Sequence, residues 1–174
     1  MKLIRTALLI LVAFVLFFAL KSQGEEAKTS YLDNISISPY ATVVHDGIGD
    51  GESYGTGIAL GLGVNKFVSI ELSATTYSDN DWRDEAVDES AVLGKFRLVK
   101  NAKESFSLYG IAGGDRDWGR DDWALSVGGG IQWKLHDNFA LFGDSRLRAW
   151  LNANDGKSKD IMTRVGVSII IPGS

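Results

Sequence analysis

The sequence contains no cysteine, only two histidines and only two prolines in 174 residues. Without cysteine the chain can form no disulfide framework and no thiolate metal site, and it has no thiol nucleophile. His45 and His136 are too few for a three-histidine zinc site, and we expect neither a metal nor a cofactor. Basic residues are also scarce, because 18 Lys and Arg stand against 22 Asp and Glu. This balance argues against a nucleic-acid partner.

An apolar run without charge covers residues 7–20 and follows a basic start with Lys2 and Arg5. A helix of this length would be about 21 Å long, which is short of the ~30 Å hydrocarbon core of a bilayer. We therefore predict a cleaved secretory signal peptide over residues 1–24, with a retained signal anchor as the alternative. The predicted mature protein is exported and acidic, and it begins with a short polar lead at residues 25–30.

After this lead, apolar residues alternate with small or polar ones at a period of two, which is typical of β-strands. Eight such segments cover residues 35–43, 57–64, 68–75, 92–98, 106–114, 123–134, 139–151 and 161–171. Most of them approach the length of roughly 9–11 residues that a tilted membrane strand needs. We predict a barrel over residues 31–171, followed by a short tail at residues 172–174.

The connections between the segments are long and short in turn. The long polar connections are His45–Ser53, Ser78–Glu89, Asp115–Asp122 and Asn152–Lys159, and the short ones are Asn65–Lys66, Lys100–Ser105 and His136–Asn138. This alternation predicts an antiparallel up-and-down barrel with loops at one rim and turns at the other. In an outer-membrane barrel the short turns face the periplasm and the longer loops are extracellular.

A soluble lipocalin-like barrel would have its apolar face inside, whereas a transmembrane barrel has it outside. The non-apolar face of the second segment is made of small residues such as Gly57 and Gly61, which suit the crowded lumen of eight strands. Aromatic residues near the segment ends would form girdles at the two lipid interfaces: Tyr54, Phe106, Trp123, Trp133 and Phe139. These features favour an all-β transmembrane barrel, and a soluble periplasmic binding barrel is an alternative.

Charged residues occupy the polar face of several segments. They are Glu71, Lys95, Arg97, Lys134, Asp144, Arg146, Arg148 and Arg164. Because buried charges must pair and hydrogen-bond, we predict a lumenal network in which Lys134 and Arg164 face Asp144 from neighbouring strands. Basic residues exceed acidic ones in this set, so we expect that loss of Asp144 or Glu71 destabilises the barrel more than loss of Arg148.

The long connections carry residues that suit contacts at the outer surface. Acidic residues dominate the first two and could bind divalent cations or a surface ligand, although solvated loops are the favoured interpretation. Aromatic residues beside arginine are typical of binding hot spots, and the candidates are Trp82, Arg83, Trp118 and Arg120. Anchoring of the barrel rim is the favoured alternative for both tryptophans.

The segment Gly128–Leu141 runs from a glycine-rich strand through a short turn into the next strand, where Asp144 and Arg146 form an acidic-x-Arg pair. This pattern resembles the sixth and seventh strands of the outer membrane protein A transmembrane-domain and opacity-type barrel superfamily, and Ser107–Gly113 is similar to its fifth strand. The resemblance implies an eight-stranded outer-membrane barrel inserted by the barrel-assembly machinery. It implies outer-membrane lipid and lipopolysaccharide as partners, and a charged lumen that plugs or gates a narrow conduit. The basic excess leaves anion preference as a minor possibility for such a conduit, and a packed polar core is the favoured interpretation.

Some barrels of this size modify lipid A, with a serine nucleophile, a histidine and a carboxylate. Here only His45 could act as the base, with Asp46 beside it and Ser53 or Ser78 across the rim. The His-x-Ser arrangement of the deacylases is absent. We therefore predict no catalytic residue and a structural or surface-interaction role, with a lipid A-modifying enzyme as the alternative.

Overall fold

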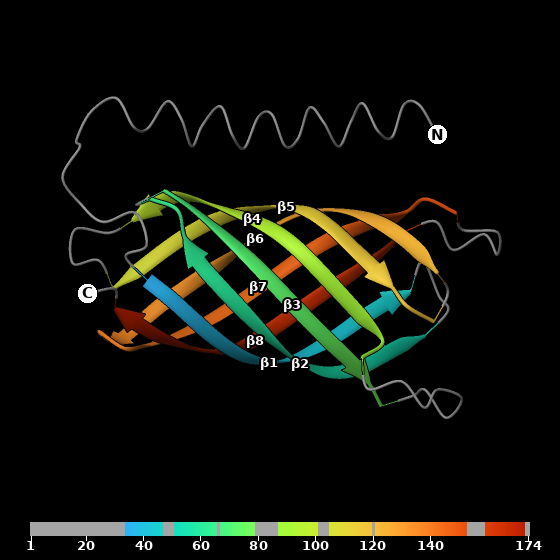
Figure 1. Cartoon of the computed structure of the whole chain (residues 1–174), viewed down its shortest axis with the longest axis horizontal. Coiled ribbons are helices and arrows are strands. Elements are labelled where there is room, and N and C mark those ends of the chain that lie inside the picture. Colours follow the sequence, from blue (N-terminus) through green and yellow to red (C-terminus); the bar gives the residue numbers. More distant parts are fainter. Residues whose placement is uncertain are drawn as a thin grey trace.

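A computed structural model describes residues 34–46, 51–65, 67–78, 87–100, 105–119, 121–152 and 159–172. The predicted signal peptide and polar lead lie outside these residues. The strands are β1 (Asn34–Asp46), β2 (Glu52–Gly63), β3 (Val68–Tyr77), β4 (Glu89–Lys100), β5 (Phe106–Asp117), β6 (Asp122–His136), β7 (Phe139–Trp150) and β8 (Lys159–Pro172). Each pairs antiparallel with the next, and β8 pairs with β1, so the sheet closes into a barrel of tilted strands (Figure 1). The predicted eight-stranded antiparallel barrel is confirmed.

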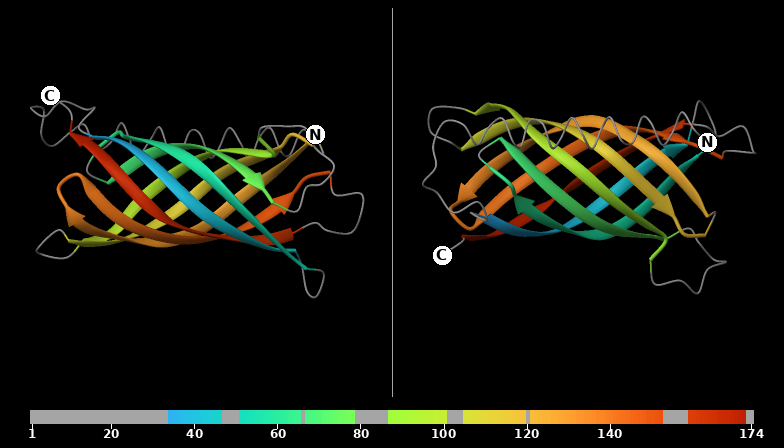
Figure 2. Two further views of the ribbon diagram at one scale, coloured as in Figure 1. Left: turned by 90° about the horizontal axis from the view of Figure 1, so that it is seen from below. Right: turned by 45° about the horizontal axis from the view of Figure 1, so that its top comes forward.

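The strand order divides the barrel into a loop rim and a turn rim. The connections β1–β2, β3–β4, β5–β6 and β7–β8 lie at the loop rim, and Asn34 pairs with Pro172 at the opposite, turn rim (Figure 2). The predicted long connection Asp115–Asp122 is wrong. The β5–β6 ladder continues through Asp117, which pairs with Asp122, so only residues 118–121 connect these strands. Among the described residues, no helix is long and apolar enough to cross a membrane.

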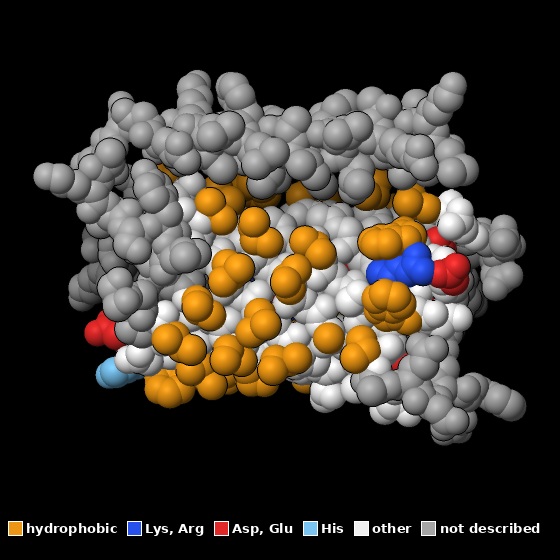
Figure 3. All heavy atoms as spheres, in the orientation of Figure 1, with side chains coloured by type: hydrophobic (Ala, Val, Ile, Leu, Met, Phe, Trp, Pro, Cys, Tyr) orange, Lys and Arg blue, Asp and Glu red, His pale blue; other side chains and the backbone are white. Residues whose placement is uncertain are grey.

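The outer wall of the barrel is apolar and the inner wall is polar. Successive side chains of a strand point to opposite faces, so one face of each strand lines the outside and the other the lumen. Leu60 is 46% exposed and Val127 60% exposed, whereas their neighbours Ala59 and Ser126 are buried. Figure 3 shows hydrophobic side chains spread over the wall between the two rims. The face assignment made from the sequence alternation is confirmed at these positions.

Glycines on the inner wall make room for aromatic rings. A Cβ added to Gly57 would lie 2.4 Å from Cζ of Tyr40, and one added to Gly130 would lie 2.7 Å from Cζ of Tyr109. Because real Cβ atoms do not approach other heavy atoms so closely, larger residues would displace these rings. The two tyrosines belong to small apolar clusters, one with Ala59 and Phe142 and the other with Ala91, Leu93 and Ile111. The lumen is thus filled by rings as well as by charges.

Candidate functional site

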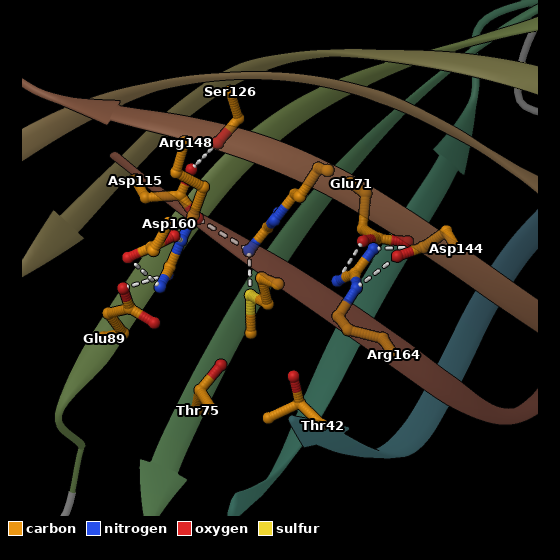
Figure 4. A network of polar contacts seen from close by, with 12 residues as sticks. Thr42, Glu71, Thr75, Glu89, Asp115, Ser126, Asp144, Arg148, Asp160 and Arg164 are labelled. Carbon is orange, nitrogen blue, oxygen red and sulfur yellow. Dashed lines mark hydrogen bonds and ion pairs between the residues drawn. The ribbon is translucent and has the colours of Figure 1, made fainter. Parts of the chain in front are cut away.

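Four charged side chains from four strands form a turn-side cluster inside the barrel, made of Glu71, Lys95, Asp144 and Arg164. Arg164 donates Nε and Nη2 to the two carboxylate oxygens of Asp144, at 2.8 Å each (Figure 4). Its Nη1 lies 2.9 Å from Oε1 of Glu71. Lys95 Nζ lies 2.5 Å from Oε2 of Glu71 and 3.8 Å from Oδ2 of Asp144. The cluster therefore contains two cations and two carboxylates, each in contact with both partners of opposite charge.

Strand register and aromatic rings hold this cluster in place. Asp144 and Arg164 are direct cross-strand partners of β7 and β8. Lys95 Nζ lies 4.9 Å from the ring centroid of Tyr109, and the Arg164 guanidinium lies 5.0 Å from that of Tyr40. Cation–π contacts and a bidentate ion pair are strongest where water is excluded. Arg164 is fully buried, so the surrounding protein groups hold its guanidinium in position.

A second, loop-side cluster lies nearer the loop rim and consists of Glu89, Asp115, Arg146, Arg148 and Asp160. Arg148 donates Nε and Nη2 to the two oxygens of Asp160, at 2.6 and 2.8 Å, and it donates Nη1 to Glu89. Arg146 Nη2 lies 2.6 Å from Oδ1 of Asp115. Three buried carboxylates thus share two guanidinium groups (Figure 4).

Neutral donors complete the loop-side cluster. The Tyr77 hydroxyl donates to Glu89, the Ser126 hydroxyl donates to Asp115, and Trp150 Nε1 donates to Asp160 at 2.7 Å. An ionised carboxylate can accept about four hydrogen bonds, so each acid has room for both an arginine and a neutral donor. Each of the three carboxylates thus accepts a hydrogen bond from a neutral side chain of the protein.

Two residues predicted in the network, Arg97 and Lys134, belong to neither cluster. Arg97 is exposed on the part of β4 near the turn rim. The cross-strand partner of Lys134 is Ala140, four residues before Asp144 in the sequence, so the predicted contact with Asp144 is wrong. Lys134 Nζ instead lies 2.8 Å from Oδ1 of Asp137 in the β6–β7 turn, and this hydrogen bond lowers the pKa of the Asp137 carboxyl.

Three acidic members of the loop-side cluster were missed by the sequence reasoning. Glu89, Asp115 and Asp160 were assigned to the long connections or their borders, yet all three are buried strand residues. The inferred basic excess is therefore wrong, and the anion preference that depended on it loses its basis. The signal was present in the alternation, because Asp160 stands two positions before Met162 on the inner face of β8.

The predicted girdle residues are exposed on the outer wall at both rims. Tyr54 and Trp123 lie near the loop rim, and Phe106, Trp133 and Phe139 lie near the turn rim. Of the predicted loop residues, Trp118 lies at the loop rim, whereas Trp82, Arg83 and Arg120 fall outside the described residues. Within the described ranges, no group of three or more His, Asp or Glu residues could hold a metal ion.

Solved structures with this architecture include outer-membrane barrels. The N-terminal β-barrel domain of Pseudomonas aeruginosa OprF has a TM-score of 0.59 and 12% identity, over 80% of this chain and 98% of that one. Neisserial surface protein A has a TM-score of 0.55 and 13% identity, over 78% and 95%. Ail of Yersinia pestis has a TM-score of 0.50 and 18% identity, over 80% and 99%. No protein-family model and no curated protein sequence matches the chain.

All three are eight-stranded outer-membrane barrels, and this chain has their fold. At identities of 12–18%, the likeness establishes the architecture. The chemistry of this chain therefore has to be argued from its own side chains.

Proposed function

We propose that this protein is a small outer-membrane barrel with a structural or surface-interaction role, whose lumen is closed by its two ion clusters. The observation that carries this proposal is the inverted polarity, with an apolar wall outside and buried charges inside. A soluble binding barrel would expose its charges to water and bury its apolar face. In a bilayer the same inversion lowers the free energy of the folded barrel, because lipid covers the apolar wall. The closed sheet also pairs the backbone hydrogen-bonding groups of every strand.

The argument for a closed lumen is one of space and charge. Eight strands leave an interior just wide enough for side chains. Arg146, Arg148 and Arg164 are all essentially inaccessible to solvent, and their guanidinium groups extend to carboxylates on other strands. An ion that crosses the lumen would have to break several buried salt bridges at once. We therefore expect no large conductance.

The rim contacts give no support to a lipid A-modifying activity. His45 Nδ1 lies 3.1 Å from Oε1 of Glu52, and Glu52 also accepts a hydrogen bond from Tyr54. The Ser78 hydroxyl donates to the carbonyl of Tyr54 at 3.0 Å. The histidine and this serine are thus oriented towards other groups, and we assign no catalytic residue.

Arginine placed at two depths of one strand tests the membrane assignment. Leu60 and Tyr54 both lie on the outer face of β2, one further along the strand and the other near the loop rim. We expect Leu60→Arg to lower the free energy of unfolding from vesicles by about 2–4 kcal/mol, and Tyr54→Arg by at most about 1 kcal/mol. Urea titration of the refolded barrel measures both. Equal small losses, or recovery of the mature chain in the soluble periplasm, would contradict the proposal.

Planar-bilayer recording tests the closed lumen directly. The refolded protein should give no large, steady channel. A stable conductance of porin size would show that the ion clusters do not close the lumen, even if the barrel inserts correctly.

A further inference from the structure

An arginine lies on the outer wall of the barrel between two tryptophan rings. The Arg116 guanidinium carbon is 5.3 Å from the ring centroid of Trp118 and 5.0 Å from that of Trp123. Figure 3 shows a basic side chain between hydrophobic groups near the loop rim, with an acidic group beside it. Both tryptophans are 51% exposed, so the rings face the surroundings as well as the arginine. We call Arg116, Trp118 and Trp123 the rim site.

Three adjacent strands fix the rim site. Arg116 on β5 pairs with Ser90 on β4 and with Trp123 on β6. Trp118 Nε1 donates a hydrogen bond to the Ser90 hydroxyl at 3.1 Å, which holds the second ring over the guanidinium. Arg116 and Trp123 are therefore part of the sheet, and Trp118 lies in the short β5–β6 turn.

Among the described residues, the charge of Arg116 is only weakly neutralised. Its Nη2 pairs with Asp121, but the Asp121 side chain is 83% exposed. Exposed ion pairs contribute little, about 0–1 kcal/mol, and exchange readily with other anions. Arg116 Nε is buried and has no hydrogen-bond partner among the described residues, so an outside anion would contact the terminal nitrogens. The two terminal nitrogens of a guanidinium can donate side by side to an anion such as a phosphate.

The wall below Arg116 suits an acyl chain. Gly114 lies two positions towards the middle of β5 on the same face, between its cross-strand partners Val92 and Leu125. A Cβ added there would come within 4 Å only of the Ala124 carbonyl oxygen among the described residues, so the space directly outside Gly114 is open. An open backbone position between two apolar side chains therefore lies directly below a cation.

We propose that the rim site binds the phosphate group of an outer-leaflet lipid, with an acyl chain of the same lipid lying over Gly114. The proposal rests on the proposed outer-membrane location, since only then does this wall face lipid. Tryptophan is enriched at membrane interfaces, where headgroups lie, and its ring face attracts a cation. The lipid phosphate displaces Asp121 from Arg116, and the carboxylate turns to water.

Native mass spectrometry of the purified full-length protein, equilibrated with diphosphorylated or fully dephosphorylated lipid A, tests this assignment. We expect the wild-type protein to retain the diphosphorylated form preferentially. Arg116→Gln should weaken that retention about tenfold, since a charge-assisted hydrogen bond is lost. Arg116→Lys, which keeps the charge but loses the planar fork, should fall between the two. Asp121→Asn should strengthen retention, because it removes the competing carboxylate.

Arg97→Gln is the matched control, because it removes an exposed arginine near the opposite rim. Its lipid retention should equal that of the wild type. The proposal is overturned if Arg116→Gln and Arg97→Gln behave alike, if both lipid A forms are retained equally, or if Asp121→Asn weakens retention. Heat-modifiable migration in phosphatidylcholine vesicles separates this outcome from failure of the proposed function. A chain that does not insert there contradicts the outer-membrane barrel itself, whereas an inserted chain without phosphate preference contradicts only the rim site.

Discussion

The two ion clusters inside the barrel bury charge in different ways. The turn-side cluster is balanced, and each of its cations contacts both of its carboxylates. The loop-side cluster has more acids than bases, and it relies on a tyrosine, a serine and a tryptophan as additional donors. Removing two charges from water costs several kcal/mol for each ion, so neither cluster is evidence of high stability in itself. The two clusters therefore differ in which side chain can be removed at the smaller cost in stability.

Buried acids gather towards the loop rim beyond the cluster itself. Asp88 accepts a hydrogen bond from the backbone N–H of Tyr77 at 2.7 Å, and Asp122 accepts one from that of Asn152 at 3.1 Å. These carboxylates cap the backbone where strands end. Buried acids near the loop rim therefore serve two purposes, namely ion pairing within the loop-side cluster and termination of strands.

The largest expected effect follows from the sharing of Arg148. Removing this side chain removes the guanidinium that both Glu89 and Asp160 contact. We expect Arg148→Ala to lower the free energy of unfolding by about 3–5 kcal/mol, because it leaves buried carboxylates unpaired in a cluster that is already acidic. Urea unfolding from lipid vesicles measures the loss. Arg97→Ala, at an exposed position, is the control and should change stability by no more than about 0.5 kcal/mol.

Loss of an acid from the turn-side cluster should cost less than loss of Arg148. Asp144→Ala leaves Lys95 and Arg164 with Glu71 as their single carboxylate partner among the described residues. We expect a loss of about 3 kcal/mol in the same assay, at the lower end of the range for a broken buried pair. A larger loss for Asp144→Ala than for Arg148→Ala would restore the ranking expected from the sequence and contradict the charge count of the structure.

The fold was predictable from the sequence because the two faces of each strand in a membrane barrel lie in different environments, an apolar exterior and a crowded polar lumen. The alternation of residue types along each strand matches these two environments. Apolar residues such as Leu60 and Val127 are exposed on the outer wall, and glycines line the crowded lumen. The alternation therefore predicted the number of strands and which face of each strand lies outside. The limit lay at the strand ends. Glu89, Asp115 and Asp160 are polar residues beside polar loops, and polarity alone cannot separate a buried strand end from a solvated loop.

The candidate site was predicted only in part for the same reason. Cross-strand partners depend on register, and a shift of a few residues changes every contact. The pair Asp144–Arg164 was placed correctly because the β7–β8 pairing is regular across it. Lys134 was misplaced because the β6–β7 register sets it against Ala140, beside a shift at the turn. The charge balance of the lumen depends on which acids near the loop rim are buried, and the amino-acid composition does not show which acids those are.

Neutral isosteres should separate the two clusters by a smaller margin. Glu71→Gln removes one of two acids from the balanced cluster, and we expect a loss of about 2 kcal/mol. Glu89→Gln removes the excess charge of the acidic cluster, while Arg148 keeps its two contacts with Asp160. We therefore expect less than about 1 kcal/mol for this change. If the two substitutions lower the free energy of unfolding equally, the excess negative charge of the loop-side cluster does not affect stability.

The smallest effect is expected outside both clusters, at the turn-rim pair of Lys134 and Asp137. The hydrogen bond and charge of Lys134 lower the pKa of Asp137, so the folded barrel holds this carboxyl ionised to a lower pH than the unfolded chain does. The stabilisation by this pair is complete above the ordinary pKa of an aspartate, and it is lost as the pH falls through the lower, folded pKa. Because the Asp137 carboxyl is fully exposed, this stabilisation is small, and the urea midpoint of Lys134→Gln at neutral pH should lie close to that of the wild type. NMR titration of the Asp137 carboxyl carbon in detergent-solubilised barrel should instead show its pKa rising towards the ordinary value in this variant. A large shift of the urea midpoint would mean that Lys134 stabilises the lumen after all, and an unchanged pKa would mean that the ion pair at the turn does not form.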